Sequence, residues 1–226
     1  MPYYWCINTM YHINIGNSTI TGINYYLDGY VVPVAEFCRD LGITITQNLF
    51  MSRYINEIAV KANERVNCIL RSFVSGDVKL LVRAFTVYVH PVVEYNTVIW
   101  SPYLINEIEL IEKVQRCFTK HLRGFNNLSY GSRLTRLGLC TLELRRLHFD
   151  LVFCYKIVFG LVHVNCDDFF TFATVANTRC HDYKLYKPYR SSNLRKKFFT
   201  DGREFHTLIT RLMYGIPFHQ LLILLP

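Results

Sequence analysis

The stretch 88–124 constrains the fold more than any other part of the chain, because two Pro-containing segments lead into one strongly amphipathic helix. Placed at about 100° per residue, one arc of this helix is apolar and consists of Ile108, Ile111, Val114, Phe118 and Leu122. A separate narrow arc is cationic and consists of Lys113, Arg116, Lys120 and Arg123. The pattern predicts a helix that packs against a core on one face and presents a row of cations on another.

The charges along this helix support the prediction. Glu109 and Lys113 are four residues apart in the favourable order, and so are Glu112 and Arg116. Acids lie near the helix start and bases near its end, which suits the helix dipole. The cationic row alone is compatible with two interpretations, an ordinary solvated helix face or a surface that binds a polyanion.

The charge distribution along the 226 residues favours a polyanion as partner. Residues 1–112 contain 7 basic and 10 acidic side chains, whereas residues 113–226 contain 18 and 7, and the chain carries a net charge of +8. A strongly basic half is typical of proteins that bind nucleic acid. Charge alone does not distinguish RNA, DNA and anionic lipid. Half of the residues are apolar, so the chain can form a core.

Cysteine usage and hydropathy bear on the compartment. The eight cysteines form no C-x-x-C pair and no zinc-finger spacing, which predicts a reduced, intracellular protein without a metal site. The N-terminus lacks the basic and apolar regions of a signal peptide. The apolar run 221–225 is far shorter than the roughly 20 residues of a membrane span. We therefore expect no membrane partner, and the compartment, cytoplasm or nucleus, stays open.

The first 47 residues are predicted to form a small antiparallel sheet. Two short β-prone runs, 25–27 and 30–32, flank Asp28-Gly29, a strong signal for a type I′ hairpin because both central positions need a positive φ. An earlier strand is expected at 11–15. Arg39 to Ile43 and the alternating residues 44–46 complete this region.

Periodic apolar residues predict helices over 51–73, 78–89, 130–137 and 141–162, in addition to the helix described first. Asp77 and Thr141 are the expected N-caps. The predicted fold class is thus α+β, mostly α, with a small N-terminal antiparallel β-hairpin sheet followed by a helical bundle. We expect three regions: 1–47, a β-hairpin region; 48–165, a helical domain; and 166–226, a basic tail that is poorly ordered or degenerate.

An ordered set of motifs in the stretch 88–124 resembles the region downstream of the catalytic core in reverse transcriptases of LINE-type (non-LTR) retrotransposons. The matching residues are Tyr88, Val89, Pro91, Glu94, Tyr95, Trp100, Ser101, Pro102, Ile111, Glu112, Val114, Gln115, Arg116, Phe118, Thr119 and Lys120. The resemblance extends over roughly residues 11 to 200. It implies that residues 48–165 correspond to the helical thumb of such an RNA-directed DNA polymerase.

Two further segments match this family and imply site residues. A segment resembling the family's primer-grip hairpin comprises Asp28, Gly29, Arg39, Asp40, Leu41 and Gly42. The segment 130–151 resembles the thumb that packs against the product duplex. The resemblance, together with the cationic row, implies duplex contact by Lys113, Arg116, Lys120, Arg123, Arg133, Arg136, Arg145 and Arg146.

The chemistry of a polymerase is not expected in this chain. Such enzymes hold two metal ions on carboxylates, and in the family these precede the Asp-Leu-Gly segment, so they would lie upstream of Met1. Asp167-Asp168 resembles a catalytic acid pair but is better explained as a helix start. There is also no glycine-rich phosphate loop and no nucleophile motif that would indicate a small-molecule substrate.

These observations together predict a truncated, non-catalytic C-terminal fragment of a non-LTR retrotransposon reverse transcriptase. We expect no enzyme activity and no cofactor, with Mg²⁺ required only by the intact polymerase. The expected partner is an RNA/DNA primer–template duplex, bound weakly and without sequence preference. Two alternatives stay open, an inactive transposable-element remnant and a helical protein-interaction module. The oligomeric state is not predicted.

Overall fold

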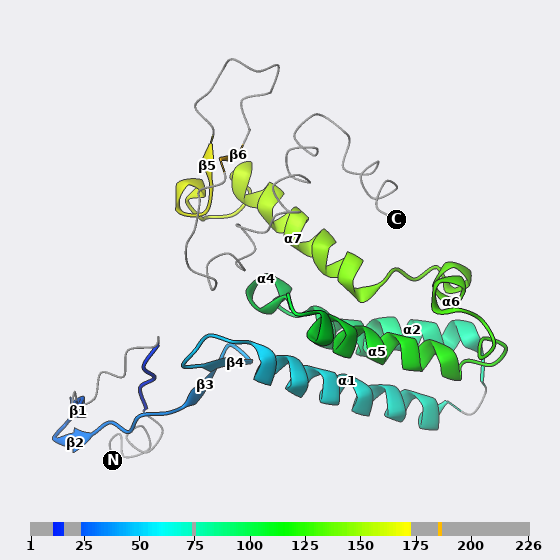
Figure 1. Ribbon diagram of the computed structural model, residues 1–226, viewed down its shortest axis with the longest axis horizontal. Coiled ribbons are helices and arrows are strands. Elements are labelled where there is room, and N and C mark those ends of the chain that lie inside the picture. Colours follow the sequence, from blue (N-terminus) through cyan, green and yellow to red (C-terminus); the bar gives the residue numbers. More distant parts are fainter. Residues whose placement is uncertain (1–10, 16–23, 74–75, 173–184, 187–226) are drawn as a thin grey trace, which may run out of the picture.

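A computed structural model describes residues 11–15, 24–73, 76–172 and 185–186, and it confirms a mixed α+β fold that is mostly helical (Figure 1). The strands pair as antiparallel hairpins and are β1 (Tyr26–Leu27), β2 (Tyr30–Val31), β3 (Phe37–Asp40), β4 (Ile43–Thr46), β5 (Thr171–Phe172) and β6 (Leu185–Tyr186). The helices are α1 (Ser52–Ser72), α2 (Val78–Tyr88), α3 (His90–Glu94), α4 (Thr97–Trp100), α5 (Ile105–His121), α6 (Tyr130–Leu137) and α7 (Leu142–Val158).

The N-terminal strands form two separate hairpins, β1–β2 and β3–β4, each closed by a two-residue turn. Asp28 and Gly29 have φ values of +48° and +83°, and Leu41 and Gly42 have φ values of +45° and +85°. Both turns therefore place two consecutive residues in the left-handed region, as a type I′ turn requires. The strand expected at 11–15 is reduced to a single bridge between His12 and Val34.

Side-chain caps mark the starts of α2 and α7, as the sequence predicts. The Asp77 side chain accepts a hydrogen bond from the Lys79 backbone N–H at the start of α2, and Thr141 accepts from that of Leu144 at the start of α7. Helix α2 ends at Tyr88, ahead of Pro91. Helix α7 ends four residues earlier than predicted, because Gly160 adopts a left-handed conformation with φ of +64°.

Helices α1, α2 and α5 lie side by side and enclose the main core (Figure 1). Four of the five residues of the apolar arc predicted for α5 lie in this core: Ile111, Val114 and Phe118 are completely buried, and Leu122 is 2% exposed. The fifth, Ile108, is only partly buried. Phe118 stacks on Phe85 of α2 with ring centroids 4.3 Å apart. Amphipathic periodicity therefore determined the orientation of α5 correctly.

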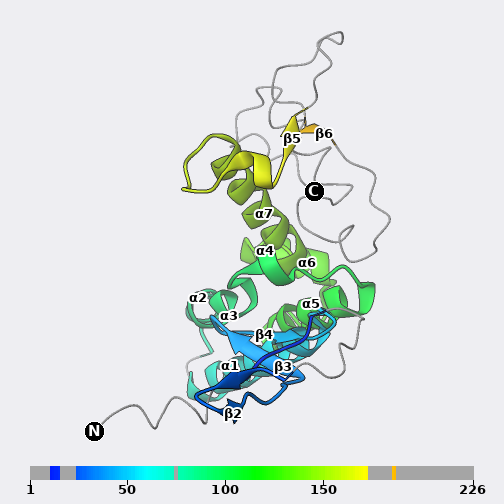
Figure 2. The ribbon, with the colours of Figure 1, turned by 90° about the vertical axis from the view of Figure 1, so that its left-hand side faces the viewer.

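The β3–β4 hairpin belongs to the same core as the helices. The hairpin lies at the N-terminal end of α1 in Figure 1 and in front of the helices in Figure 2, and Ile43 of β4 is 2% exposed within the helical core cluster. Trp100 at the end of α4 is also enclosed; its ring meets Tyr54 of α1 edge-on, and its indole N–H donates to the Tyr95 carbonyl. Packing thus crosses the boundary predicted after residue 47.

A second, smaller core lies along the C-terminal half of α7. Leu151, Cys154 and Ile157 of that helix pack with Phe170, which follows a short 3₁₀ helix, Cys166–Asp168. This core crosses the boundary predicted after residue 165. Most of the predicted basic tail, 166–226, lies outside the described residues.

Candidate nucleic-acid interface

The four cations predicted on α5 and its C-terminal turn form one exposed row. Lys113, Lys120 and Arg123 are exposed, and the side chain of Arg116 is 42% exposed. We call these residues the α5 cationic row. At a rise of about 1.5 Å per residue, Lys113 and Lys120 lie roughly 10 Å apart along the helix axis. The row therefore extends over several phosphate charges of a duplex.

Arg116 is the most constrained member of the row. Its guanidinium forms an ion pair with Glu109 at 2.9 Å and lies 5.2 Å from the centroid of the Tyr130 ring. The hydrogen bond to Glu109 raises the pKa of Arg116. The ion pair differs from the predicted pairing of Arg116 with Glu112, because Glu112 is turned inward and is 6% exposed.

The two predicted contact residues of α6 differ in exposure. Arg136 is exposed in the last turn of α6, whereas Arg133 is 4% exposed. The Arg133 guanidinium lies 5.5 Å from the centroid of the Tyr130 ring, which it shares with Arg116. We therefore retain Arg136 and exclude Arg133 from the candidate interface.

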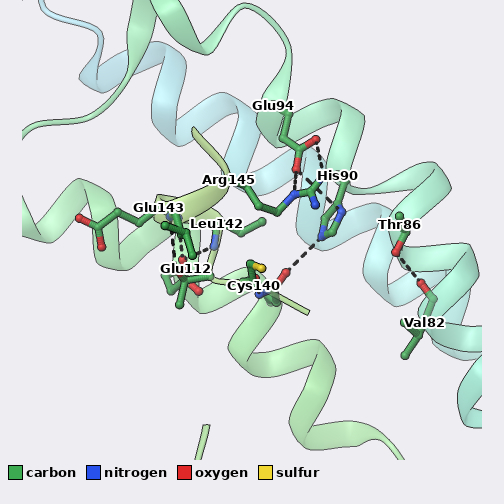
Figure 3. Close-up of polar contacts among 12 residues, drawn as sticks. Val82, Thr86, His90, Glu94, Glu112, Cys140, Leu142, Glu143 and Arg145 are labelled. Carbon is green, nitrogen blue, oxygen red and sulfur yellow. Dashed lines mark hydrogen bonds and ion pairs between the residues drawn. The ribbon is translucent and has the colours of Figure 1, made fainter. Parts of the chain in front are cut away.

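Unlike Arg136, the two predicted arginines of α7 are not free to contact a duplex. Arg145 donates two hydrogen bonds to the carboxylate of Glu94 on α3, and this raises its pKa (Figure 3). Arg146 is 3% exposed, and neither of its terminal nitrogens has a hydrogen-bond partner among the described residues. Burial lowers the pKa of Arg146, although Glu112 and other nearby carboxylates oppose the shift. The direct duplex contact predicted for Arg146 is incompatible with its position.

A buried polar network, not predicted from the sequence, lies behind the cationic row. The fully buried Gln115 accepts a hydrogen bond from Nε2 of His90 at 3.1 Å. Its amide nitrogen donates to the Tyr130 hydroxyl at 3.1 Å and to the Cys140 carbonyl at 2.8 Å. The Tyr130 hydroxyl donates in turn to Glu112. The network fixes the position of the Tyr130 ring, and thereby the surface on which Arg116 rests.

Burial governs the proton affinities in this network. It lowers the pKa of His90, although the nearby Glu94 carboxylate opposes the shift. Burial and the hydrogen bond to Glu112 also raise the pKa of Tyr130, so its hydroxyl keeps its proton. The sequence places Gln115 and Glu112 in a predicted helix but indicates neither their burial nor their partners.

The residues predicted to form a primer-grip-like hairpin are divided between two hairpins. Asp28 and Gly29 form the exposed β1–β2 turn. The other four, Arg39, Asp40, Leu41 and Gly42, form the end of β3 and the turn into β4. This second turn is fixed to the helical region, because the Tyr95 hydroxyl donates to the Leu41 carbonyl at 2.9 Å. Leu41 itself is 77% exposed.

The acidic pair has the geometry of a helix start. Asp167 and Asp168 are exposed in the 3₁₀ helix, and the Asn165 side chain accepts from the backbone N–H of Asp167. Within the part of the chain that the structure describes, no three His, Cys, Asp or Glu side chains are grouped to hold a metal ion. The helices described here also include none that is long and apolar enough to cross a membrane.

Comparison with known proteins gave no match to any family model, any curated protein or any solved structure.

Proposed function

We propose that this chain binds an RNA/DNA primer–template duplex weakly and without sequence preference. The contact surface in this proposal is the α5 cationic row together with Arg136 of α6. The observation that carries the proposal is the separation of the two faces of α5: Ile111, Val114 and Phe118 are completely buried, whereas Lys113 and Lys120 are exposed on another face. Such a line of charges binds phosphates by counterion release and has no groups arranged to read base edges.

The proposed role follows the resemblance to the thumb of LINE-type reverse transcriptases. In that role α5 would lie along the phosphate backbone, and the chain would contribute binding without catalysing nucleotide transfer. A primer-extension assay with Mg²⁺ and deoxynucleotides tests the second part: we expect no extended product. Extension by the pure chain would contradict the assignment as a non-catalytic region.

A charge-reversal experiment tests the contact surface directly. We expect the triple variant Lys113→Glu, Lys120→Glu, Arg123→Glu to bind a labelled RNA–DNA hybrid more weakly than wild type. The slope of log K against log salt should also become shallower by about two to three, because each lost phosphate contact releases roughly one counterion fewer. Fluorescence anisotropy over a series of salt concentrations measures both quantities.

The matched control reverses three exposed cations elsewhere: Lys61 of α1 with Lys79 and Arg83 of α2. This variant has the same net charge as the test variant but an intact α5 cationic row. If the two variants lose affinity and slope equally, the binding depends on overall charge and the proposed surface is wrong.

A second candidate function, protein binding, is favoured by one apolar patch. Ile99, Tyr103, Leu104 and Ile105 around the α4–α5 connection are 38% to 81% exposed. Contiguous exposed apolar residues are typical of protein-interaction sites. Partner capture that persists at high salt and is lost in Ile105→Asp would favour this function, since duplex binding fades as salt screens the charges.

A further inference from the structure

The three carboxylates of α5 have different surroundings. Glu107 is 7% exposed and accepts from the Ser52 hydroxyl, and Glu112 is 6% exposed within the polar network. The side chain of Glu109 is 53% exposed and is paired with Arg116. Glu109 is therefore the one acid of α5 that a ligand arriving from solvent can meet.

Glu109 also lies in line with the α5 cationic row. At about 100° per residue, Lys113, Arg116 and Lys120 all fall within about 40° of the direction of Glu109. The row thus contains an anion at its N-terminal end, within hydrogen-bond distance of one of its own cations. A phosphate that approaches the row meets Arg116 with its guanidinium already engaged.

We propose that Glu109 is an internal competitor for phosphate: it occupies Arg116 in the free chain and is displaced when a polyanion binds. The inference rests on the proposed function and adds the residue that limits its affinity. In the bound state Arg116 exchanges the Glu109 carboxylate for a phosphate oxygen pair, and Glu109 turns to solvent.

The geometry favours such an exchange. The ion pair is half-exposed at both ends, and exposed pairs of this kind are held weakly. The Tyr130 ring supports the guanidinium from a second direction, and the ring is itself fixed by Glu112 and Gln115. Arg116 therefore keeps its place when Glu109 leaves, and a planar guanidinium can pair with two phosphate oxygens at once.

The test is a binding cycle with a fluorescein-labelled RNA–DNA hybrid of mixed sequence. Glu109→Gln should tighten binding by about two- to fivefold, the range expected from the loss of a weak exposed ion pair, and should steepen the salt slope. Glu64→Gln is the matched control, because it removes one exposed acid of α1 that is not in the row. We expect a smaller change for this control at physiological salt, where exposed charges beyond about 8 Å are largely screened.

The Arg116→Gln background distinguishes competition between Glu109 and phosphate for Arg116 from simple repulsion of the phosphates by Glu109. If Glu109 acts by occupying Arg116, Glu109→Gln should gain clearly less affinity in the Arg116→Gln background than in wild type. Arg116→Met provides a second background if Arg116→Gln does not fold, because methionine keeps an unbranched side chain without the charge that pairs with Glu109. Thermal unfolding of each variant verifies that it is folded.

Two results would overturn the inference while leaving the proposed function intact: Glu109→Gln binding no tighter than Glu64→Gln, or an equal gain with and without the Arg116 guanidinium. In both cases the triple charge reversal of the row would still weaken binding. If wild type does not bind the hybrid at all, the proposed function fails, and the inference fails with it.

Discussion

At the scale of single residues, Asp150 and Arg146 show how protein surroundings change an ionisable group. They lie one turn apart on α7, and both are nearly enclosed. Burial raises the pKa of Asp150 from its ordinary 3.8 to about 7, and the charge of Arg146 offsets only part of that shift. One carboxylate oxygen of Asp150 also lacks a hydrogen-bond partner among the described residues. The carboxyl group is therefore more stable protonated than ionised below neutral pH.

This shift predicts a pH-dependent effect of Asp150→Asn on stability. Between about pH 4 and pH 7 the folded state binds a proton at Asp150 that the unfolded state has released, so wild-type stability falls as the pH rises through that window. Asparagine has no such proton to lose. We expect the free energy of unfolding of the variant, relative to wild type, to increase by up to a few kcal/mol across the window and to stay constant above it.

Urea unfolding at a series of pH values measures this difference. Asp167→Asn is the control, because Asp167 is an exposed acid and its replacement should leave the pH profile close to that of wild type. A constant offset between Asp150→Asn and wild type at all pH values would show that Asp150 has an ordinary pKa in the folded state.

In the candidate interface, residue type was a good guide to exposure for the lysines but not for all of the arginines. Lys113 and Lys120 are exposed, as their positions off the apolar arc predicted. Arg133 and Arg146 are buried beside Tyr130 and Asp150, partners that are brought to them only by the packing of α5, α6 and α7. Periodicity within one helix carries no information on such contacts.

At the scale of secondary-structure elements, Glu112 is the link between α5 and the start of α7. Its carboxylate accepts from the backbone N–H groups of Leu142 at 2.9 Å and Glu143 at 3.4 Å, as well as from Tyr130 (Figure 3). The first N–H groups of a helix have no partners within the helix, and its N-terminus attracts negative charge. Glu112 therefore caps α7 from a neighbouring helix, in addition to the local cap from Thr141.

We expect Glu112→Gln to lower the free energy of unfolding by about 1–3 kcal/mol, because an amide carries no charge and its NH₂ group cannot accept from the α7 backbone. Chemical denaturation followed by circular dichroism measures the loss. Glu109→Gln provides a control with the same chemical change on the exposed side of the same helix, and should shift stability by less than about 0.5 kcal/mol. Equal effects of the two substitutions would refute the capping role.

Local signals predicted several helix boundaries, but they missed the short helices α3 and α4, and the partners of the helices could not be predicted from them. Asp77, Thr141 and the apolar arc of α5 predicted where helices begin and which way one of them faces. The favourable spacing of Glu112 and Arg116 was misleading, because a tertiary contact with a helix N-terminus is stronger than an exposed i,i+4 pair. Glu112 consequently faces inward, and Arg116 pairs with Glu109.

At the scale of the whole molecule, the β3–β4 hairpin and the helices share one core through Ile43. Removing most of this side chain should leave a cavity between β4 and α1, so Ile43→Ala should destabilise the helices as well as the hairpin by about 2–4 kcal/mol. Loss of helical circular dichroism on denaturation provides the measurement. Val31→Ala in the exposed β2 strand should have little effect. A hairpin that unfolds without the helices would contradict the shared core.

The sequence predicted the fold class, but it did not predict how the regions pack across the proposed boundaries. The order of hairpins followed by helices came from turn residues and periodicity, and the α+β class is confirmed. The predicted division after residue 47 relied on a change of pattern, which does not reveal that Ile43 is buried against α1. The division after residue 165 likewise does not reveal that Phe170 packs on α7.

The buried position of Trp100 makes it an intrinsic fluorescence probe of this part of the fold. The chain has two tryptophans, and Trp100 is 1% exposed, against Tyr54, with its indole N–H held by the Tyr95 carbonyl. In a Trp5→Phe background, the emission of Trp100 would come from this single sheltered ring where α1 and α4 meet. A red shift of the Trp100 emission would show that water has entered the contact between α1 and α4, without an attached dye.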